Sequence, residues 1–269
     1  MERTIVIIKH VENEGPGFIG EFFKTERWGI KTIELWKHEP LPDSLDNIAA
    51  VVMLGGPMNV YEEERYPFLK EEDRFITKLI IDGIPFLGVC LGAQLLAKSC
   101  GGKVIKAPKK EMGWYEVTLT NEGKHDTLFQ GSGKRITVFQ WHEDTFLLPD
   151  GIPILARGKR CKNQAFRIGD YAYGLQFHIE VTYEMVKVWM KDEMEKEGLE
   201  KILKDTNKII KKYRKESFTI LQNFKRCIEL SLYIRDAVNV LAEDMLLSDR
   251  KRSLFWIERS ERAIEDLIE

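Results

Sequence analysis

A cysteine stands between two glycines at the point where an apolar run gives way to a helical pattern. The run 85–89 (PFLGV) precedes Cys90, and Gly92 and Gln94 follow it in a stretch with apolar residues at helical spacing. This order predicts a strand, a sharp turn and a helix, because glycines relieve the crowding of a turn that presents one side chain at its tip. A thiol at the first turn of a helix faces unpaired backbone N–H groups, which favour the thiolate. We interpret Cys90 as a candidate nucleophile, with a small buried hydrophobic residue as the plain alternative.

A second stretch could supply the base for such a nucleophile. Residues 174–181 (GLQFHIEV) alternate like a strand, so Gln176, His178 and Glu180 are expected to share one face. Glu180 could then hydrogen-bond to His178 and fix its tautomer, which completes a nucleophile, base and orienting acid. The structural alternative is a half-buried sheet edge with a satisfied histidine.

Together the two stretches resemble the class I glutamine amidotransferases, whose elbow reads Gly-x-Cys-x-Gly and whose histidine strand reads Gln-x-His-Pro-Glu. The segments 54–60 (LGGPMNV), 112–114 (MGW) and 139–146 (FQWHEDTF) fit the same family. The nearest likeness is to its stand-alone, GMP-synthase-like branch. The resemblance covers roughly residues 1–193, and a weaker similarity reaches about Leu230. Ile179 stands where the family usually has proline.

The resemblance implies roles for further residues. The backbone amides of Gly56 and Leu91 would form the oxyanion hole, where loss of one donor typically costs about 10²–10³-fold in turnover. The resemblance also places a set of residues around the bound glutamine: Gly55, Gln94, Trp141, Glu143 and Asp144. His142 is an alternative base beside two acidic residues, but the family pattern favours a place in the pocket wall for it.

The order of apolar segments predicts the fold class. Strands expected at 4–8, 31–36 and 48–54 alternate with helical patterns such as 68–82, which indicates a parallel sheet. Short strands at 103–105, 114–120, 135–140, 154–157, 164–167 and 172–178 favour a mixed or antiparallel part. We therefore expect an α/β fold, with an open, mostly parallel or mixed sheet and flanking helices in flavodoxin-like layers.

The chain changes character near its end. We expect a class I glutamine amidotransferase-like α/β domain over residues 1–193 and a helical extension over 194–269. The extension is highly charged, has apolar residues at helical spacing, and contains no glycine or proline after Gly198. These features predict several amphipathic helices. We expect the part from about Ser231 to contact a second copy of the chain or another protein.

Composition limits the kinds of partner and cofactor that we expect for the chain. The formal net charge of -2 gives no reason to expect nucleic acid, and no apolar run is long enough to span a bilayer. The 4 cysteines and 5 histidines show no metal-ligand spacing. We expect no metal or other cofactor, and a reducing cytoplasm as the location.

The main functional hypothesis is hydrolysis of a γ-glutamyl amide through Cys90, His178 and Glu180, with a glutamyl-thioester intermediate. No synthetase domain or nucleotide-binding motif follows, so ammonia from glutamine would need a separate accepting protein. The first alternative is a γ-glutamyl peptidase or hydrolase that acts on γ-glutamyl peptides. The second is a partner-dependent or non-catalytic glutamine-binding module.

Overall fold

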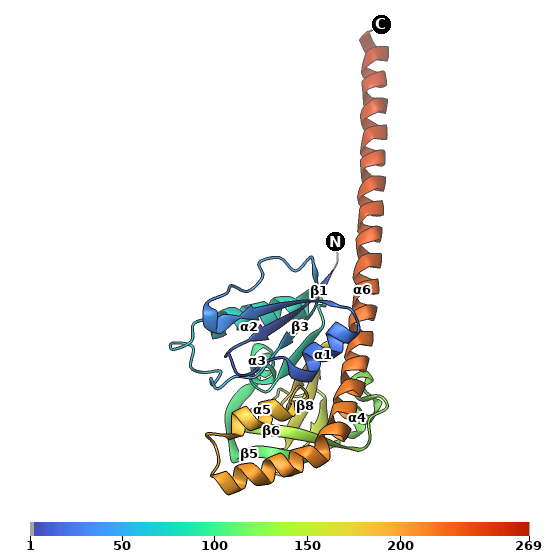
Figure 1. Cartoon of the computed structure of the whole chain (residues 1–269). Coiled ribbons are helices and arrows are strands. Elements are labelled where there is room, and N and C mark those ends of the chain that lie inside the picture. The colour runs from blue at the N-terminus through green and yellow to red at the C-terminus, as the bar shows by residue number, and fades with distance from the viewer. Residues whose placement is uncertain (1–2, 269) are drawn as a thin grey trace. The chain divides into compact units, whose positions relative to one another are not determined.

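The computed structural model describes the backbone of residues 3–268 and the side chains of residues 3–241 (Figure 1). Its contacts divide the chain into two compact units, Met1–Ile228 and Glu229–Glu269. Each unit is described separately.

The first unit is built on a mixed sheet. Within the described residues it has nine strands in the order β2-β1-β3-β4-β9-β8-β7-β5-β6. The strands are β1 (Thr4–Lys9), β2 (Gly29–Glu34), β3 (Ile48–Met53), β4 (Phe86–Val89), β5 (Lys103–Leu119), β6 (Arg135–Leu147), β7 (Ile154–Arg157), β8 (Asn163–Ile168) and β9 (Ala172–Leu175). The five strands from β2 to β9 pair in parallel, and the pairs from β9 to β6 are antiparallel. The predicted fold class is confirmed.

Helices border the sheet, and two buried clusters join most of them to it. They are α1 (Gly17–Thr25), α2 (Phe68–Ile81), α3 (Leu91–Ser99), α4 (Asn121–His125), α5 (Tyr183–Met190) and α6 (Lys196–Ile268), with short 3₁₀ turns at Leu35–Lys37 and Thr127–Phe129. One buried cluster joins α2 and α3 to β1, β3 and β4. A second cluster joins α1, α5 and the first part of α6 to β6. Because β3 is buried along its whole length, its six apolar residues read as a continuous hydrophobic run.

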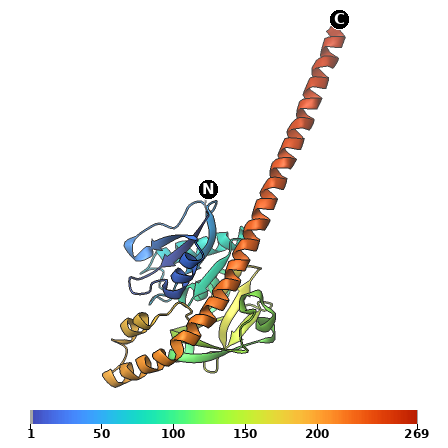
Figure 2. The same ribbon diagram turned by 45° about the vertical axis from the view of Figure 1, so that its right-hand side comes forward.

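The first part of α6, through Ile228, packs into the first unit. Its orange ribbon lies beside the strands in both views (Figures 1 and 2). Trp114 Nε1 on β5 donates a hydrogen bond to Thr206 Oγ1 on α6 at 2.9 Å, and Tyr213 and Phe224 are completely buried. This half of the predicted extension is therefore part of the compact unit. The predicted domain boundary after residue 193 stays a prediction about the family domain.

Three local predictions were wrong. The segment 174–181 leaves the sheet after Leu175, and only an isolated bridge joins His178 to Phe139 of β6. The strand expected at 135–140 continues to Leu147 as β6, because residues 140–144 also pair with β5. The expected strands at 103–105 and 114–120 are one strand, β5, with an irregularity between Lys106 and Glu111.

The prediction of several C-terminal helices was also wrong, since α6 is one helix from Lys196 to Ile268. No glycine or proline interrupts it after Gly198, so nothing in the sequence ends it early. The described residues of the second unit, 229–268, form the later part of this helix. The predicted apolar positions at Met245, Ile257, Ile264 and Ile268 lie outside the residues whose side chains are described. None of the described helices is both long and apolar enough to cross a membrane.

Candidate active site

Cys90 sits at a sharp elbow between β4 and α3. Its backbone has φ 52° and ψ −105°, so a non-glycine residue takes a strained, left-handed φ at the N-cap of the helix. A Cβ at Gly88 would collide with the backbone of Gly92, and a Cβ at Gly92 would collide with the backbone of Met53. The two glycines therefore allow β4, α3 and β3 to approach closely, while the cysteine itself carries the backbone strain.

His178 and Glu180 meet as the sequence predicted, although the segment that carries them is not a regular strand. His178 Nδ1 lies 2.6 Å from Glu180 Oε1. The other carboxylate oxygen accepts a hydrogen bond from the Ile179 N–H at 2.9 Å. A proline at position 179, the usual family residue, has no N–H to donate there. Glu180 is therefore held from two sides.

Tyr213 of α6 supports the same segment from behind. Its hydroxyl donates to His178 O at 3.0 Å and accepts from Val181 N at 3.1 Å. The ring of Trp189 on α5 lies edge-on to the His178 imidazole, with 5.2 Å between ring centroids. Sequence analysis did not identify either residue, because both come from helices that only the tertiary fold brings to the site.

The charge state of His178 is set by opposing effects. Burial by itself lowers the pKa of the imidazole, but the negative charge of Glu180 and the neighbouring Cys90 outweigh burial and raise the pKa well above its usual value. His178 Nε2 is buried and makes no hydrogen bond within the described part of the chain. The Cys90 thiol donates to Trp141 O at 3.8 Å, and Gln176 Nε2 donates to Cys90 Sγ at 3.9 Å.

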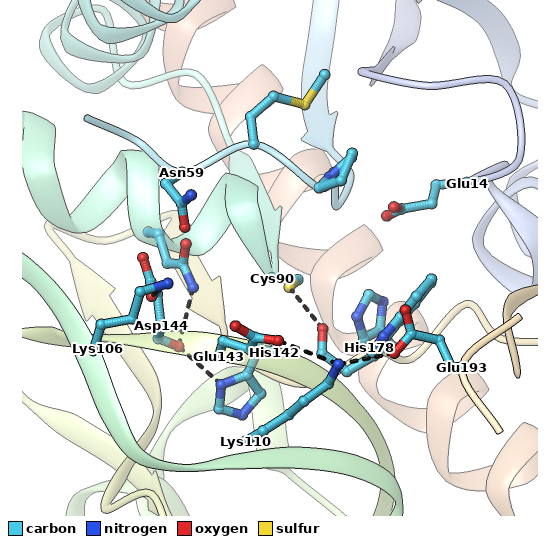
Figure 3. Close-up of a pocket in the computed structure, with 15 residues that line it drawn as sticks. Glu14, Asn59, Cys90, Lys106, Lys110, His142, Glu143, Asp144, His178 and Glu193 are labelled. Atoms are coloured by element: carbon cyan, nitrogen blue, oxygen red, sulfur yellow. Dashed lines mark hydrogen bonds and ion pairs between the residues drawn. The ribbon is translucent and has the colours of Figure 1, made fainter. Parts of the chain in front are cut away.

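A pocket of about 260 Å³ opens over Cys90 (Figure 3). Seven of the residues nominated from the sequence line it: Gly56, Cys90, Gln94, Trp141, Glu143, Asp144 and His178. The other three nominated residues, Gly55, Leu91 and Glu180, are absent from its lining. Glu180 lies behind His178, and Gly55 and Leu91 belong to the backbone segments that flank Cys90.

The pocket carries charges of both signs. Lys106 Nζ lies 2.8 Å from Asp144 Oδ1, and Gln94 Nε2 donates to Asp144 O at 3.2 Å. Lys110 pairs with Glu143 at 3.2 Å and with Glu193 at 2.8 Å. Such an arrangement suits a zwitterionic ligand, because an amino group and a carboxylate can both find partners of opposite charge.

The glycine loop after β3 is fixed by a buried histidine. His10 Nδ1 donates to Gly55 O at 2.8 Å, and its Nε2 lies 2.8 Å from Glu72 Oε1. A Cβ at Gly56 would lie 2.9 Å from His10 Cβ and 3.0 Å from Leu91 Cδ2. The loop therefore lies against the start of α3, beside the elbow.

Sequence analysis missed several pocket residues. Glu14, Asn59, Lys106 and Glu193 line the pocket and come from four separate segments, of which only that of Asn59, 54–60, belongs to a quoted motif. Glu14 follows β1, and the carboxyl ends of the parallel strands meet at one edge of the sheet, so its position carried a usable signal. Asn59 lies in the quoted family segment 54–60, whereas Lys106 and Glu193 gave no signal in the sequence.

His142 is tied into a buried network rather than placed as a second base. Its Nδ1 donates to Asp144 O at 2.8 Å, and its Nε2 lies 3.2 Å from Glu111 Oε2. Glu111, His142 and Cys161 bring three potential metal-ligand atoms within 4.8 Å of one another. Gln164 Nε2 also donates to Glu111 Oε2 at 3.0 Å. Because hydrogen bonds within the protein already satisfy these groups, the network needs no ion.

The fold and the pocket together define a class of enzyme. A cysteine on a strand–helix elbow, faced by a histidine that a glutamate orients, is the arrangement of cysteine-dependent amide hydrolases and transferases.

Comparison with known proteins identifies the family. The model of the family "Glutamine amidotransferase class-I" matches residues 24–196. The chain is 31% identical over 183 residues to a putative glutamine amidotransferase-like protein, YfeJ, of Salmonella typhimurium, which covers 67% of this chain and 77% of the relative. The chain belongs to the class I glutamine amidotransferase family.

Two further relatives are similar over the same region. A subunit of the glutamine-hydrolysing GMP synthase of Pyrococcus abyssi is 29% identical, over 64% of this chain and 89% of the relative. The crystal structure of a glutamine amidotransferase from Thermotoga maritima superposes with a TM-score of 0.77 and 36% identity, over 85% of this chain and 99% of that one. By contrast, the match to GMP synthase of Thermosipho melanesiensis spans only 31% of that longer enzyme.

Proposed function

We propose that the protein hydrolyses the γ-amide of glutamine or of a related γ-glutamyl compound through a triad of Cys90, His178 and Glu180. The observation that carries the proposal is the state of His178. Its Nδ1 is bound to Glu180 at 2.6 Å, its Nε2 makes no hydrogen bond within the described residues, and His178 lines the same pocket as Cys90. A base with one nitrogen oriented and the other open is what proton transfer to a ligand requires.

The proposed reaction follows from these groups. The Cys90 thiolate attacks the γ-carbonyl carbon, and the amides of Gly56 and Leu91 stabilise the oxyanion. The C–N bond then breaks as the His178 imidazolium gives its proton to the leaving nitrogen, which leaves a glutamyl thioester. His178 next takes a proton from water, whose oxygen attacks the thioester and releases glutamate and the thiolate.

The mixed charges of the pocket support recognition of an amino acid. We propose that Gln94 and the segment Trp141–Asp144 hold the glutamyl end, with Asp144 or Glu143 accepting from its α-amino group. Trp141 contributes through its backbone oxygen, which already accepts from Cys90. Gly55 contributes by its lack of a side chain, because a Cβ there would lie 3.2 Å from His178 Cε1.

The proposed reaction releases ammonia, which a second protein could accept. The relatives include one subunit of a GMP synthase and longer glutamine-hydrolysing GMP synthases. By analogy, ammonia released at Cys90 would pass to a separate accepting protein. A hydrolase that acts on γ-glutamyl peptides would need no such partner.

Glutamate release tests the proposal. The purified chain is given glutamine or a γ-glutamyl dipeptide, with Cys90→Ala and Cys100→Ala as a matched pair, because Cys100 is a half-buried cysteine outside the pocket. We expect release that Cys90→Ala abolishes and Cys100→Ala retains. Preference for the dipeptide would indicate a γ-glutamyl hydrolase, and preference for glutamine an amidotransferase. Glutamate release that persists in Cys90→Ala would overturn the triad.

We also propose that the second unit mediates self-association. Exposed apolar side chains gather on α6 beyond Ile228, with exposed fractions of 44–73%: Leu230, Tyr233, Ile234, Val238, Val240 and Leu241. Leu230, Ile234, Val238 and Leu241 recur at intervals of four, four and three residues, so they share one helical face. Such a face is typical of helices that pair with another helix.

A further inference from the structure

Glu14 is a buried carboxylate that the proposed reaction does not use. Its exposed fraction is 9%, and it lines the same pocket as Cys90 and His178. Within residues 3–241, no group donates a hydrogen bond to this carboxylate, and no cationic side chain forms an ion pair with it. The positive groups that act on its charge are the imidazoles of His178 and His10. Because the carboxylate lines the pocket without a hydrogen-bond donor of its own, it is free to accept one from a ligand group of opposite charge.

Gly55 shows how near Glu14 lies to the reacting groups. A Cβ built on Gly55 would lie 2.5 Å from Glu14 Oε2, 3.2 Å from His178 Cε1 and 3.5 Å from Cys90 Cβ. The carboxylate, the imidazole and the elbow thus surround one point. Any side chain at position 55 would displace Glu14, so the glycine makes room for the carboxylate.

The loop that carries Glu14 is fixed against the triad segment. Trp189 Nε1 donates to Asn13 O at 3.0 Å. On the other side, Phe18 N donates to Glu180 O at 2.8 Å. Because the loop is tied at both ends to the elements that hold His178 and Glu180, Glu14 keeps a defined position beside them.

The labelled residues lie at two ends of the pocket. Asn59, Lys106 and Asp144 lie on one side of Cys90, and Glu14, His178 and Glu193 lie on the other, where Glu193 pairs with Lys110 (Figure 3). The first end has both signs of charge and suits the glutamyl amino acid. His178 must stand beside the leaving nitrogen to protonate it, and Glu14 is on the same side as His178. The leaving group therefore faces Glu14.

We propose that Glu14 selects γ-glutamyl amides whose leaving amine carries a second, positively charged nitrogen, such as a diamine. This inference rests on the proposed γ-glutamyl hydrolysis and names its substrate class. The carboxylate would accept a charge-assisted hydrogen bond from the distal ammonium, which a neutral or anionic leaving group cannot offer. The chemistry at Cys90 is unchanged: water replaces the amine, and His178 supplies the proton with which the amine leaves.

The electrostatics of Glu14 agree with this role. Burial raises the pKa of the Glu14 carboxyl, and the positive charges of His178 and His10 only partly oppose that effect. A cation bound beside Glu14 would stabilise the ionised form and remove the penalty of burial.

Three substrates of matched length test the inference. They are the γ-glutamyl amides of 1,4-diaminobutane, n-pentylamine and 4-aminobutyrate, whose leaving groups are cationic, neutral and anionic. For the wild-type chain we expect kcat/KM to be about tenfold higher for the cationic than for the neutral substrate, the effect of one charge-assisted contact. Glu14→Gln should bring this ratio close to one. Glu12→Gln, a change of an exposed residue in the same loop, should keep it.

The outcomes separate the inference from the proposed function. Cys90-dependent cleavage of all three substrates at similar rates would uphold the function and overturn the role of Glu14. A cationic preference that survives in Glu14→Gln would overturn it as well. If none of the substrates, nor glutamine, is cleaved, both proposals fall. A general loss of folding in Glu14→Gln would lower all three rates together and leave the ratio of the cationic to the neutral substrate unchanged. Lost selectivity would change that ratio.

Discussion

Glu180 acts on His178 through one short hydrogen bond and through its charge. The pKa of His178 is raised because this charge, with Cys90 nearby, outweighs the effect of burial. The proposed mechanism needs the imidazolium when the amine departs. The upper pH limit of activity should therefore follow the raised pKa of His178.

We predict that Glu180→Gln lowers kcat by about 10²–10⁴-fold, the range seen when a triad acid is neutralised. The alkaline limb of the kcat/KM profile should also move to lower pH. The limb moves in this direction because loss of the negative charge lowers the pKa of His178, so the imidazolium loses its proton at lower pH. The measurement is a pH profile of glutamate release, with Glu184→Gln as the control, an exposed residue nearby. An alkaline limb that stays in place would contradict the role of Glu180.

The same raised pKa affects folding. Because the pKa of His178 is higher in the folded than in the unfolded state, its contribution to stability is fully present below the unfolded pKa, about 6.5. That contribution is lost as the pH rises through the folded value. Glu180→Gln should therefore destabilise the chain more at pH 6 than at strongly alkaline pH.

At the scale of elements, helix α6 positions the triad segment from behind. Tyr213 on this helix bridges His178 O and Val181 N with its hydroxyl. The helix is far from the site in sequence, yet it holds the backbone of the candidate base.

We predict that Tyr213→Phe lowers the free energy of unfolding by about 1–3 kcal/mol, because it leaves two buried backbone groups without their partner. It should also reduce kcat, since His178 loses a support. Urea unfolding and glutamate release measure the two effects. Tyr233→Phe is the matched control, because Tyr233 is 73% exposed. Unchanged stability in Tyr213→Phe would show that other contacts hold the segment.

The elbow makes a second prediction at this scale. Gly88→Ala places a methyl group against the backbone of Gly92 and Ala93. Because the clashing atoms belong to the backbone, no side-chain movement can relieve the clash. We expect a loss of more than about 2 kcal/mol of stability. Gly198→Ala is the control: its new methyl group meets Met194 only at 3.5 Å or more, and it gains helix propensity. Equal thermal unfolding of the two variants would contradict the close approach of β4 and α3.

At the scale of the whole molecule, the two compact units allow a separation of roles. We predict that a chain ending at Leu230 stays folded and retains glutamate release, because the described pocket lies within Met1–Ile228. Its mass by light scattering should fall to that of a monomer if the second unit drives self-association. A full-length chain that is already monomeric, or a truncated chain that keeps the oligomeric mass, would contradict this proposal.

Local signals in the sequence determined much of the first unit. Buried strands such as β3 can be recognised as continuous apolar runs. The elbow can be recognised from Gly88 and Gly92 on either side of Cys90. The pairing of His178 with Glu180 follows from alternation over two residues, which survives although the segment leaves the sheet after Leu175. These features depend on residues close together in the chain, so the sequence alone could predict them.

Only the tertiary structure decided the rest. Glu14, Lys106 and Glu193 enter the pocket from separate segments, and Tyr213 reaches His178 from α6. The strand through residues 140–144 exists because β5 pairs with it, and not through a local preference of its own. Such contacts join residues far apart in sequence, and their geometry depends on how the elements pack. The sequence therefore determined the candidate chemistry at Cys90 and His178, and the packing decided which charges surround it.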